Sequence, residues 1–236
     1  MRKLLASEKK QPILISFSGM DGAGKSTQIS NLRAYAEDLG LRVTQLAFWD
    51  DVVVLKPYRE GFVQKVFKSE KGIGSPEKPV ERRDKNVRGW HLNLVRHGLY
   101  SLDAVHLRAV TNQVRKSNAD LVIMDRYIYD ELANLPLENP VTRAYVHAVM
   151  KMVPHPDVSF VLDADPVLAR ARKPEYPVEF LHKCRASYLG LAEMLGDITV
   201  VPALGLADAR HFIEVAFRAL LERRRRARAA TGWRAA

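Results

Sequence analysis

The sequence contains only one cysteine, Cys184, among its 236 residues. One cysteine can form no disulfide within the chain, which excludes a disulfide-stabilised fold and fits a reducing cytoplasm. Long apolar runs are also missing. No stretch reaches the length that crosses a bilayer, and the apolar part of residues 1–6 is too short for a signal peptide. We therefore expect a cytoplasmic protein that does not associate with a membrane.

Histidine is scarce, and acidic residues are outnumbered by basic ones. The seven histidines are scattered without the spacing of metal ligands, so a structural metal site is not expected. The formal net charge is +10, and half of this excess lies in residues 222–236, where six arginines accompany a single glutamate. A basic tail can bind nucleic acid, but these arginines are not interleaved with aromatic residues. We expect a solvated helix end and no nucleic-acid partner.

Residues 19–27 satisfy the pattern G-x-x-x-x-G-K-[ST], the most informative feature of the chain. The apolar run 13–17 predicts a short buried strand before the motif, and residues 28–35 predict a helix after it, as a phosphate-binding P-loop requires. Glycines let the backbone approach an anion, and N–H groups of the turn and the helix N-terminus point at the phosphates. The residues predicted to bind the nucleotide, ATP, are Gly19, Asp21, Gly22, Ala23, Gly24, Lys25, Ser26 and Thr27.

The second functional signal is an aspartate–arginine pair, Asp125 and Arg126. Asp125 follows the buried run 121–124, where a P-loop protein carries the Walker-B-type carboxylate that holds the Mg²⁺ shell. In the same mechanism Lys25 lies along the β- and γ-phosphates and the Ser26 hydroxyl reaches Mg²⁺. Arg126 can offer a bidentate fork to a phosphate, and a surface salt bridge is the alternative interpretation of this residue.

The third signal is a basic stretch at residues 170–177 that contains two prolines. It predicts a loop between two helical stretches, after a strand at 158–162. Such a loop can close as a lid over transferring phosphates and bring Arg170 and Arg172 to them. The alternative is that these arginines are only solvated charges.

Apolar β-branched runs alternate with helical patterns along the chain. This alternation predicts an α/β fold, a parallel sheet with helices on both faces, in which ligands bind beyond the carboxyl ends of the strands. Residues 68–88 predict a long loop. From Val87 to Val114 apolar residues recur mostly every three or four positions, which predicts a long amphipathic helix whose stripe, including Leu102 and Val105, mostly faces the core. The candidate strands are residues 13–17, 42–47, 121–124, 158–162 and 198–201.

These signals together resemble the thymidylate kinase family of nucleoside monophosphate kinases. Residues 21–28 look like the P-loop of that family, residues 125–127 are similar to its D-R-Y/F/H motif, and residues 179–192 resemble the helix that follows its lid. The resemblance covers most of residues 12–220. It implies a single three-layer P-loop kinase domain over 1–236 with a five-stranded parallel sheet, a homodimer, and transfer of the ATP γ-phosphoryl group to a nucleoside monophosphate.

The resemblance also implies roles for particular residues. Some members of the family place an arginine inside the P-loop, where this chain has Ala23, so the lid at about 170–178 should supply that charge. The site that the resemblance implies has three parts. The catalytic residues are Lys25, Asp125, Arg126, Arg170 and Arg172. The acceptor-binding residues are Asp21, Tyr100, Arg126, Asn134 and Glu179, and the Mg²⁺ ligands are Ser26 and Asp125.

Departures from the family pattern gather on the acceptor side. The R-x-P-G-G stretch of the family is absent, and residues 48–51 stand in its place. Tyr100 aligns with the phenylalanine that stacks on thymine, Ala104 with the arginine that reads the base, and Asn134 with the tyrosine that senses the sugar. The residues that could replace the missing phosphate clamp are Lys56, Arg59 and Arg96.

The leading interpretation is therefore an Mg²⁺- and ATP-dependent kinase of a nucleoside monophosphate, with dTMP as the first candidate acceptor. One alternative is a P-loop kinase of a different acceptor, such as a nucleoside, polyphosphate or another metabolite. A second alternative is an ATP-binding regulatory or nucleic-acid-binding protein that uses its arginine-rich tail, residues 222–236.

Overall fold

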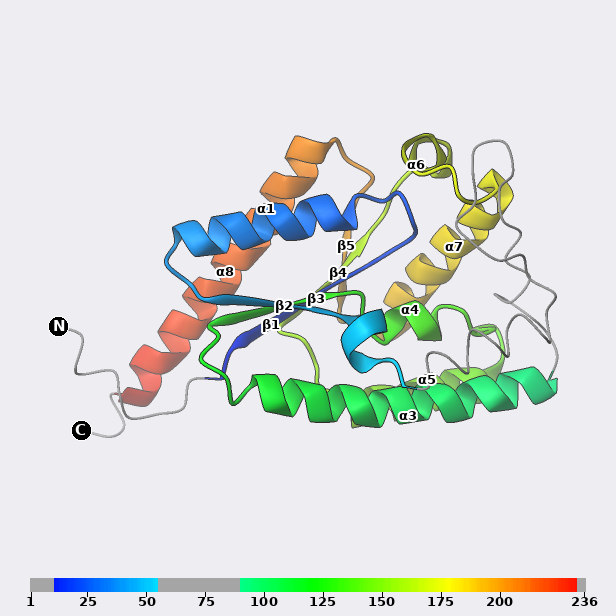
Figure 1. The fold of residues 1–236 in the computed structure, drawn as a ribbon, viewed down its shortest axis with the longest axis horizontal. Helices are drawn as coiled ribbons and strands as arrows, with labels where there is room; N and C mark the ends of the chain where they lie inside the picture. Colours follow the sequence, from blue (N-terminus) through cyan, green and yellow to red (C-terminus); the bar gives the residue numbers. More distant parts are fainter. Residues whose placement is uncertain (1–10, 55–89, 233–236) are drawn as a thin grey trace.

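A five-stranded, all-parallel sheet forms the centre of the molecule, in the strand order β2-β3-β1-β4-β5. The computed structural model describes residues 11–54 and 90–232 (Figure 1). All five predicted strands are confirmed, with ends that differ by at most one residue, as is the α/β class. The strands are β1 (Ile13–Ser18), β2 (Val43–Ala47), β3 (Leu121–Asp125), β4 (Val158–Leu162) and β5 (Ile198–Val201). The predicted loop 68–88, Val87, Lys56 and Arg59 lie outside the described residues.

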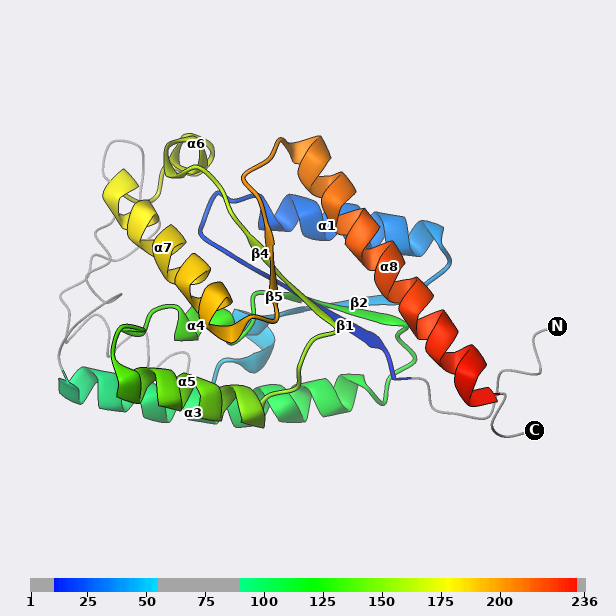
Figure 2. The ribbon, with the colours of Figure 1, turned by 180° about the vertical axis from the view of Figure 1, so that it is seen from behind.

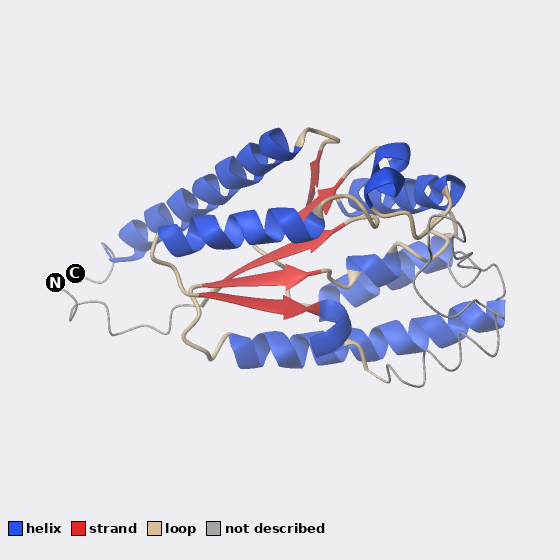
Figure 3. Ribbon diagram, turned by 45° about the horizontal axis from the view of Figure 1, so that its top comes forward, coloured by secondary structure: helices blue, strands red, loops and turns tan. Residues whose placement is uncertain are grey.

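Helices cover both faces of this sheet (Figures 1 and 2). Alternate residues of β1 point to opposite faces: Ile15 and Phe17 pack with α1 and α8, whereas Leu14 joins the core beneath α3, α5 and α7. Figure 3 shows the sheet between these two helical layers. The helices are α1 (Lys25–Asp38), η1 (Phe48–Val52), α3 (Trp90–Val114), α4 (Tyr129–Leu132), α5 (Pro140–Met152), α6 (Pro166–Arg172), α7 (Val178–Leu195) and α8 (Leu206–Gly232).

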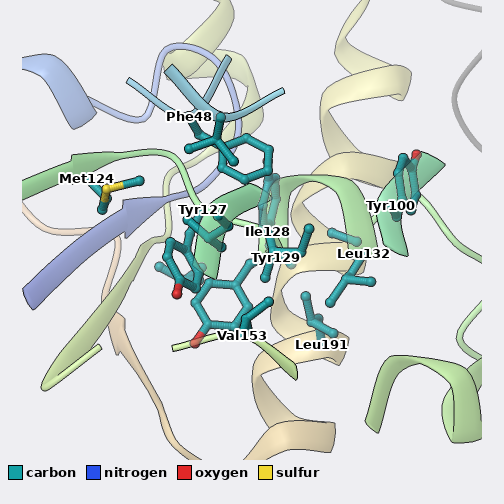
Figure 4. Packing of buried hydrophobic residues seen from close by; sticks show 14 of the residues in the cluster. Phe48, Tyr100, Met124, Tyr127, Ile128, Tyr129, Leu132, Val153 and Leu191 are labelled. Carbon is teal, nitrogen blue, oxygen red and sulfur yellow. The ribbon is translucent and has the colours of Figure 1, made fainter. Parts of the chain in front are cut away.

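An aromatic cluster fills the core beside the carboxyl end of β3 (Figure 4). Tyr127 and Tyr129 are fully or almost fully buried, and their ring centroids lie 5.2 Å apart. Each buried hydroxyl has a partner, since Tyr127 donates to the Pro154 carbonyl and Tyr129 pairs with Ser159. Phe48 of η1 is fully buried in the same core. This packing fixes the end of β3 and the turn after it, where the predicted pair of Asp125 and Arg126 lies.

The buried face of α3 differs from the predicted one. Leu102 and Val105, predicted to face the core, are 51% and 55% exposed. The helix instead buries Tyr100, Asp103, Ala104, Leu107 and Thr111. Asp103 belongs to this face because it has a partner there: its carboxylate accepts a hydrogen bond from the Val54 amide at 2.8 Å. Apolar periodicity alone could not reveal a helix face that binds main-chain groups of a neighbouring loop.

The basic tail continues a long helix. Most of residues 222–236 belong to α8, which runs to Gly232. Arg224 is held by both carboxylate oxygens of Asp157, at 2.7 and 2.8 Å, and donates to the Gln11 carbonyl at 2.9 Å. One arginine of the tail therefore anchors the helix to the amino-terminal end of the sheet. Within the described residues, no helix is both long and apolar enough to cross a membrane.

Candidate active site

The carboxyl ends of β1 and β3 lie side by side and carry two of the predicted functional segments. Phe17 pairs with Asp125 in the parallel register, and the Arg126 amide donates to the Phe17 carbonyl at 2.9 Å. The P-loop follows β1, and the aspartate–arginine pair ends β3. Because β1 lies between β3 and β4, these loops open at the point of the sheet where ligands bind in parallel α/β folds.

The P-loop backbone needs glycine at defined positions. Gly22 and Gly24 have φ values of 81° and 90°, in the left-handed region that glycine adopts without strain. Gly24 caps the start of α1. A Cβ at Gly22 would clash with the main-chain carbonyl of Ala169 in α6. The missing side chain therefore lets α6 lie directly against the P-loop.

Lys25 is a buried cation in this loop. Its Nζ donates to the carbonyls of Gly19 at 2.8 Å and Met20 at 3.0 Å, and the residue is 8% exposed. Among the described residues, no carboxylate forms an ion pair with this ammonium group. Burial, helped by the charge of Arg126, lowers the pKa of Lys25 from 10.5 to about 8, although three nearby aspartates oppose the shift. Because this buried ammonium group is bound only by neutral carbonyls, an anionic ligand would stabilise its charge.

Arg126 is held by two carboxylates. Its Nη1 donates to Asp130 Oδ1 at 2.7 Å, and its Nη2 donates to Asp21 Oδ1 at 2.6 Å. Burial opposes the charge of this guanidinium, but Asp130, Tyr188 and Asp21 together raise its pKa above the ordinary value. Its backbone has a φ of 68°, the only positive φ of a non-glycine residue in the described chain. Such a conformation persists only where surrounding contacts enforce it.

Asp21 connects three segments of the site. Besides Arg126, it lies 4.0 Å from the Nζ of Lys173, which in turn lies 3.3 Å from Glu175. Lys173 belongs to the connection between α6 and α7, the predicted lid. The P-loop, the turn after β3 and this connection therefore meet at one aspartate.

Arg170 and Arg172 lie in a helix, which corrects the predicted loop at 170–172. They occupy the last turn of α6. The helix forms because Asp165 caps its N-terminus, accepting hydrogen bonds from the next two free amides, and Pro166 follows at the first helical position. Arg172 reaches the P-loop, since its Nη1 donates to the Gly22 carbonyl at 3.2 Å. Arg170 is half-buried on the same turn.

The two predicted Mg²⁺ ligands, Ser26 and Asp125, lie after β1 and at the end of the neighbouring strand β3, respectively. Ser26 is exposed in the first turn of α1, and Asp125 ends β3, close enough to Lys25 to influence its pKa. Mg²⁺ is commonly bound by one or two protein oxygens together with substrate phosphates and water. The buried ammonium, the glycine cradle and these two oxygens fit a magnesium–nucleotide complex.

The remaining predicted acceptor residues have different surroundings. Tyr100 is largely buried in the core beneath the sheet. Asn134 donates through its side-chain amide to the Asp130 carbonyl at 2.7 Å. Glu179 is exposed in the first turn of α7. Asn134 is thus tied to the turn that carries Arg126, whereas Glu179 extends into solvent.

Several curated thymidylate kinases are similar to this chain over most of its length. A probable thymidylate kinase of Methanosphaera stadtmanae is 26% identical over 200 residues, which are 82% of this chain and 91% of that protein. A probable thymidylate kinase of Sulfolobus acidocaldarius is 29% identical over 80% of this chain and 88% of its own length. This chain is similar to thymidylate kinases over most of its length. The thymidylate kinase of Bifidobacterium longum subsp. infantis is 25% identical over 76% and 74% of the two chains. No family model matches the sequence.

The sequence did not indicate one residue of the site, Asp130, whose carboxylate is buried. It lies in α4, four residues after Arg126, and is 4% exposed. The spacing of four residues between an arginine and an aspartate is a helical ion-pair signal that could have indicated it. Its other partners, Ser18 and Tyr188, lie 112 and 58 residues away and carry no local signal.

The segment that replaces the R-x-P-G-G stretch of the thymidylate kinases is fixed by α3. Residues 48–52 form the short helix η1. The Val54 amide binds Asp103, and the Val52 carbonyl lies 2.6 Å from His106 Nδ1. The sequence did not indicate these two α3 residues, because a buried aspartate and a histidine interrupt the expected apolar stripe.

Proposed function

We propose that this protein is an Mg²⁺- and ATP-dependent nucleoside monophosphate kinase that transfers the γ-phosphoryl group of ATP to dTMP. The observation that carries the proposal is that two cations, Lys25, which is buried, and Arg126, which is partly buried, lie at adjacent strand ends. Lys25, held only by carbonyls, lies in the P-loop, and Arg126 lies in the neighbouring turn. The similarity to thymidylate kinases along most of the chain supports the choice of dTMP.

The donor side follows from the P-loop. Lys25 exchanges its carbonyl partners for the β- and γ-phosphates, and the amides at the start of α1 bind the same anion. Ser26 and Asp125 hold the metal shell. When bound, Mg²⁺ neutralises charge on the phosphate oxygens. Arg172, and Arg170 beside it, lie on the helix that packs on Gly22, from which they stabilise the charge of the transferring group.

The acceptor side is built on Arg126. Its guanidinium has five N–H donors and uses two of them on Asp130 and Asp21, so others are free to bind the acceptor phosphate. Asp21 contacts the acceptor or the water shell of the metal. Tyr100, Asn134 and Glu179 complete the proposed acceptor set. A phosphate acceptor is anionic at neutral pH, so no general base is required.

The remaining parts of the proposal rest on the composition of the chain and, for the dimer, the kinase core and the lid, on the resemblance to the thymidylate kinases. The protein acts as a cytoplasmic homodimer without a nucleic-acid partner. Its kinase core spans about residues 12–220 and its lid about 170–178, and residues 222–236 form a basic end of the last helix. Gel filtration with light scattering tests the dimer: a mass of about twice 26.7 kDa is expected, and a monomer at assay concentration contradicts it.

The decisive experiment measures ADP release with Mg²⁺-ATP against a panel of nucleoside monophosphates, with thymidine and polyphosphate alongside. We expect selective turnover of dTMP that requires Mg²⁺. The Lys25→Met variant is the control for contaminating kinases. Selective turnover of another acceptor would keep the kinase but reassign the substrate. Tight ATP binding without turnover of any acceptor would reject the proposal in favour of a nucleotide-binding regulator.

A further inference from the structure

Asp130 is not one of the predicted site residues. It is the centre of a buried polar cluster that includes one of them, Arg126. Its side chain is 2% exposed and accepts four hydrogen bonds, and the five residues involved are called the Asp130 cluster here. Oδ1 accepts from Arg126 Nη1 and from the Tyr188 hydroxyl, each at 2.7 Å. Oδ2 accepts from the Ser18 hydroxyl at 2.6 Å and from the Tyr127 amide at 3.2 Å. Both oxygens are therefore fully used.

The donors of the Asp130 cluster come from segments that border the reaction site. Ser18 ends β1 directly before the first P-loop glycine, and Arg126 and Tyr127 form the turn after β3. Tyr188 lies on α7, the helix that follows the predicted lid. Burial, together with Asp130, raises the pKa of the Tyr188 hydroxyl well above its ordinary value, so this group stays a donor. One carboxylate thus ties the P-loop strand to the arginine turn and to α7.

Burial of a carboxylate raises the free energy of the folded protein unless hydrogen bonds and ion pairs compensate for it. One partner of Asp130 has an unusual backbone conformation. Arg126 adopts the left-handed backbone region without being glycine. Its side chain is gripped on one nitrogen by Asp130 and on the other by Asp21. Asp21 is 18% exposed and also lies 4.0 Å from the Nζ of Lys173, whereas the Asp130 side chain is 2% exposed and has no second cation among its partners in the described residues. Asp130 is therefore the permanent support of the guanidinium.

We propose that Asp130 is the positioning residue that fixes the Arg126 guanidinium for the acceptor phosphate. This inference rests on the function proposed above. Asp130 does not touch the substrates. It acts by holding one nitrogen of the arginine, so that the remaining N–H groups face the acceptor in a fixed plane and little side-chain freedom is lost on binding.

Asp130→Asn tests the proposal most directly, because asparagine has nearly the same size as aspartate but replaces one acceptor oxygen by an NH₂ group that only donates. Each oxygen of Asp130 serves one partner that can only donate, Arg126 or the Tyr127 amide, and one hydroxyl that can turn. The asparagine oxygen can serve only one of the two fixed donors. Either the arginine or the main-chain turn that carries it loses its support.

Steady-state kinetics test the proposal. For Asp130→Asn we expect the KM for dTMP to rise about 10- to 100-fold, while the KM for ATP stays within about 2-fold. Asp157→Asn is the matched control, since Asp157 also pairs with an arginine but lies at the opposite end of the sheet. It should leave both constants unchanged. Equal changes in the two KM values of Asp130→Asn, or an unchanged KM for dTMP, would overturn the proposal.

Two further variants separate positioning from a general loss of core packing. Tyr188→Phe removes a donor of the Asp130 cluster but leaves the contact with Arg126, so the KM for dTMP should change less than about 3-fold. A change as large as that of Asp130→Asn would contradict the proposal. In an Arg126→Ala background, Asp130→Asn should add no further increase in KM, because the group through which it acts is gone. A fully additive effect would exclude action through Arg126.

A readout without turnover distinguishes failure of this inference from failure of the proposed function. Nuclear magnetic resonance of the ¹⁵N-labelled wild-type protein should show slow rotation of the Arg126 guanidinium without any nucleotide. Fast rotation would overturn the inference, even if Asp130→Asn does not fold. Slow rotation in a protein that does not phosphorylate dTMP would reject only the proposed acceptor.

Discussion

The two cations at the adjacent ends of β1 and β3, Lys25 and Arg126, are held in opposite ways. Lys25 binds two neutral carbonyls, and its pKa is lowered to about 8. Arg126 binds two carboxylates, and its pKa is raised. In the function proposed above, Lys25 serves the donor side and Arg126 the acceptor side. The donor side then has a cation without an ion-pair partner among the described residues, which an incoming polyphosphate would stabilise. The acceptor side keeps a cation that is already neutralised, so its orientation matters more than its charge.

The largest expected effect is the loss of turnover in Lys25→Met. This substitution removes the cation that the proposed function places on the ATP side of the site. Removal of a charge that contacts the transferring phosphates should lower kcat by about 10³-fold or more. The fold should survive, because the substitution also relieves a desolvated ammonium group. Assays of ADP release and circular dichroism check both points. Turnover within about tenfold of wild type would show that Lys25 is not the donor cation.

The second prediction concerns the stability of Arg126→Ala. This substitution leaves the Asp130 carboxylate buried without its cation, a loss that typically costs about 3–5 kcal/mol. The free energy of unfolding, measured in urea without ligands, should fall by about that amount. Lys25→Met is the comparison variant and should lose less than about 1 kcal/mol, because its carbonyl partners are neutral. Equal losses in the two variants would remove the distinction between the cations.

The third prediction is a pH dependence of stability that Lys25 causes. Its pKa is about 8 when folded and 10.5 when unfolded, so between these values the unfolded chain binds more protons and the free energy of unfolding rises with pH. From pH 7 to pH 10, wild type should gain about 2–3 kcal/mol relative to Lys25→Met. The measurement uses urea unfolding without nucleotide and with excess chelator. A pH-independent difference would contradict a depressed pKa.

The fold and the position of the P-loop between β1 and α1 could be predicted because their signals are local. The strands are continuous apolar runs that end where the buried sheet ends, and the P-loop residues lie within nine consecutive positions. Residues 170–172 were predicted to lie in a loop, because charged residues and prolines are frequent in residues 170–177. The cap of Asp165 and the proline after it instead start a helix that runs through Arg172.

The acceptor side could be predicted only in part, because its geometry depends on long-range polar contacts. Asp130 joins Ser18, Arg126 and Tyr188, which no periodic pattern connects. Asp103 is buried on α3 only because a main-chain amide from the segment after β2 meets it. A polar residue at a core position reads as an interruption of the apolar stripe until its partner is known.

The smallest expected effect tests whether the order of α6, which carries the start of the proposed lid, matters for catalysis. Asp165 caps α6 by accepting hydrogen bonds from two amides, and Asn139 caps α5 by accepting one; each cap is followed by proline. Alanine at either position should lower stability by about 1 kcal/mol, seen as similar decreases in Tm. Only Asp165→Ala should also lower kcat, by about threefold, because α6 carries Arg170 and Arg172 and packs on Gly22. Equal kcat values in the two variants would mean that fraying of α6 does not reach the transferring phosphate, and that Arg172 acts from a position the cap does not control.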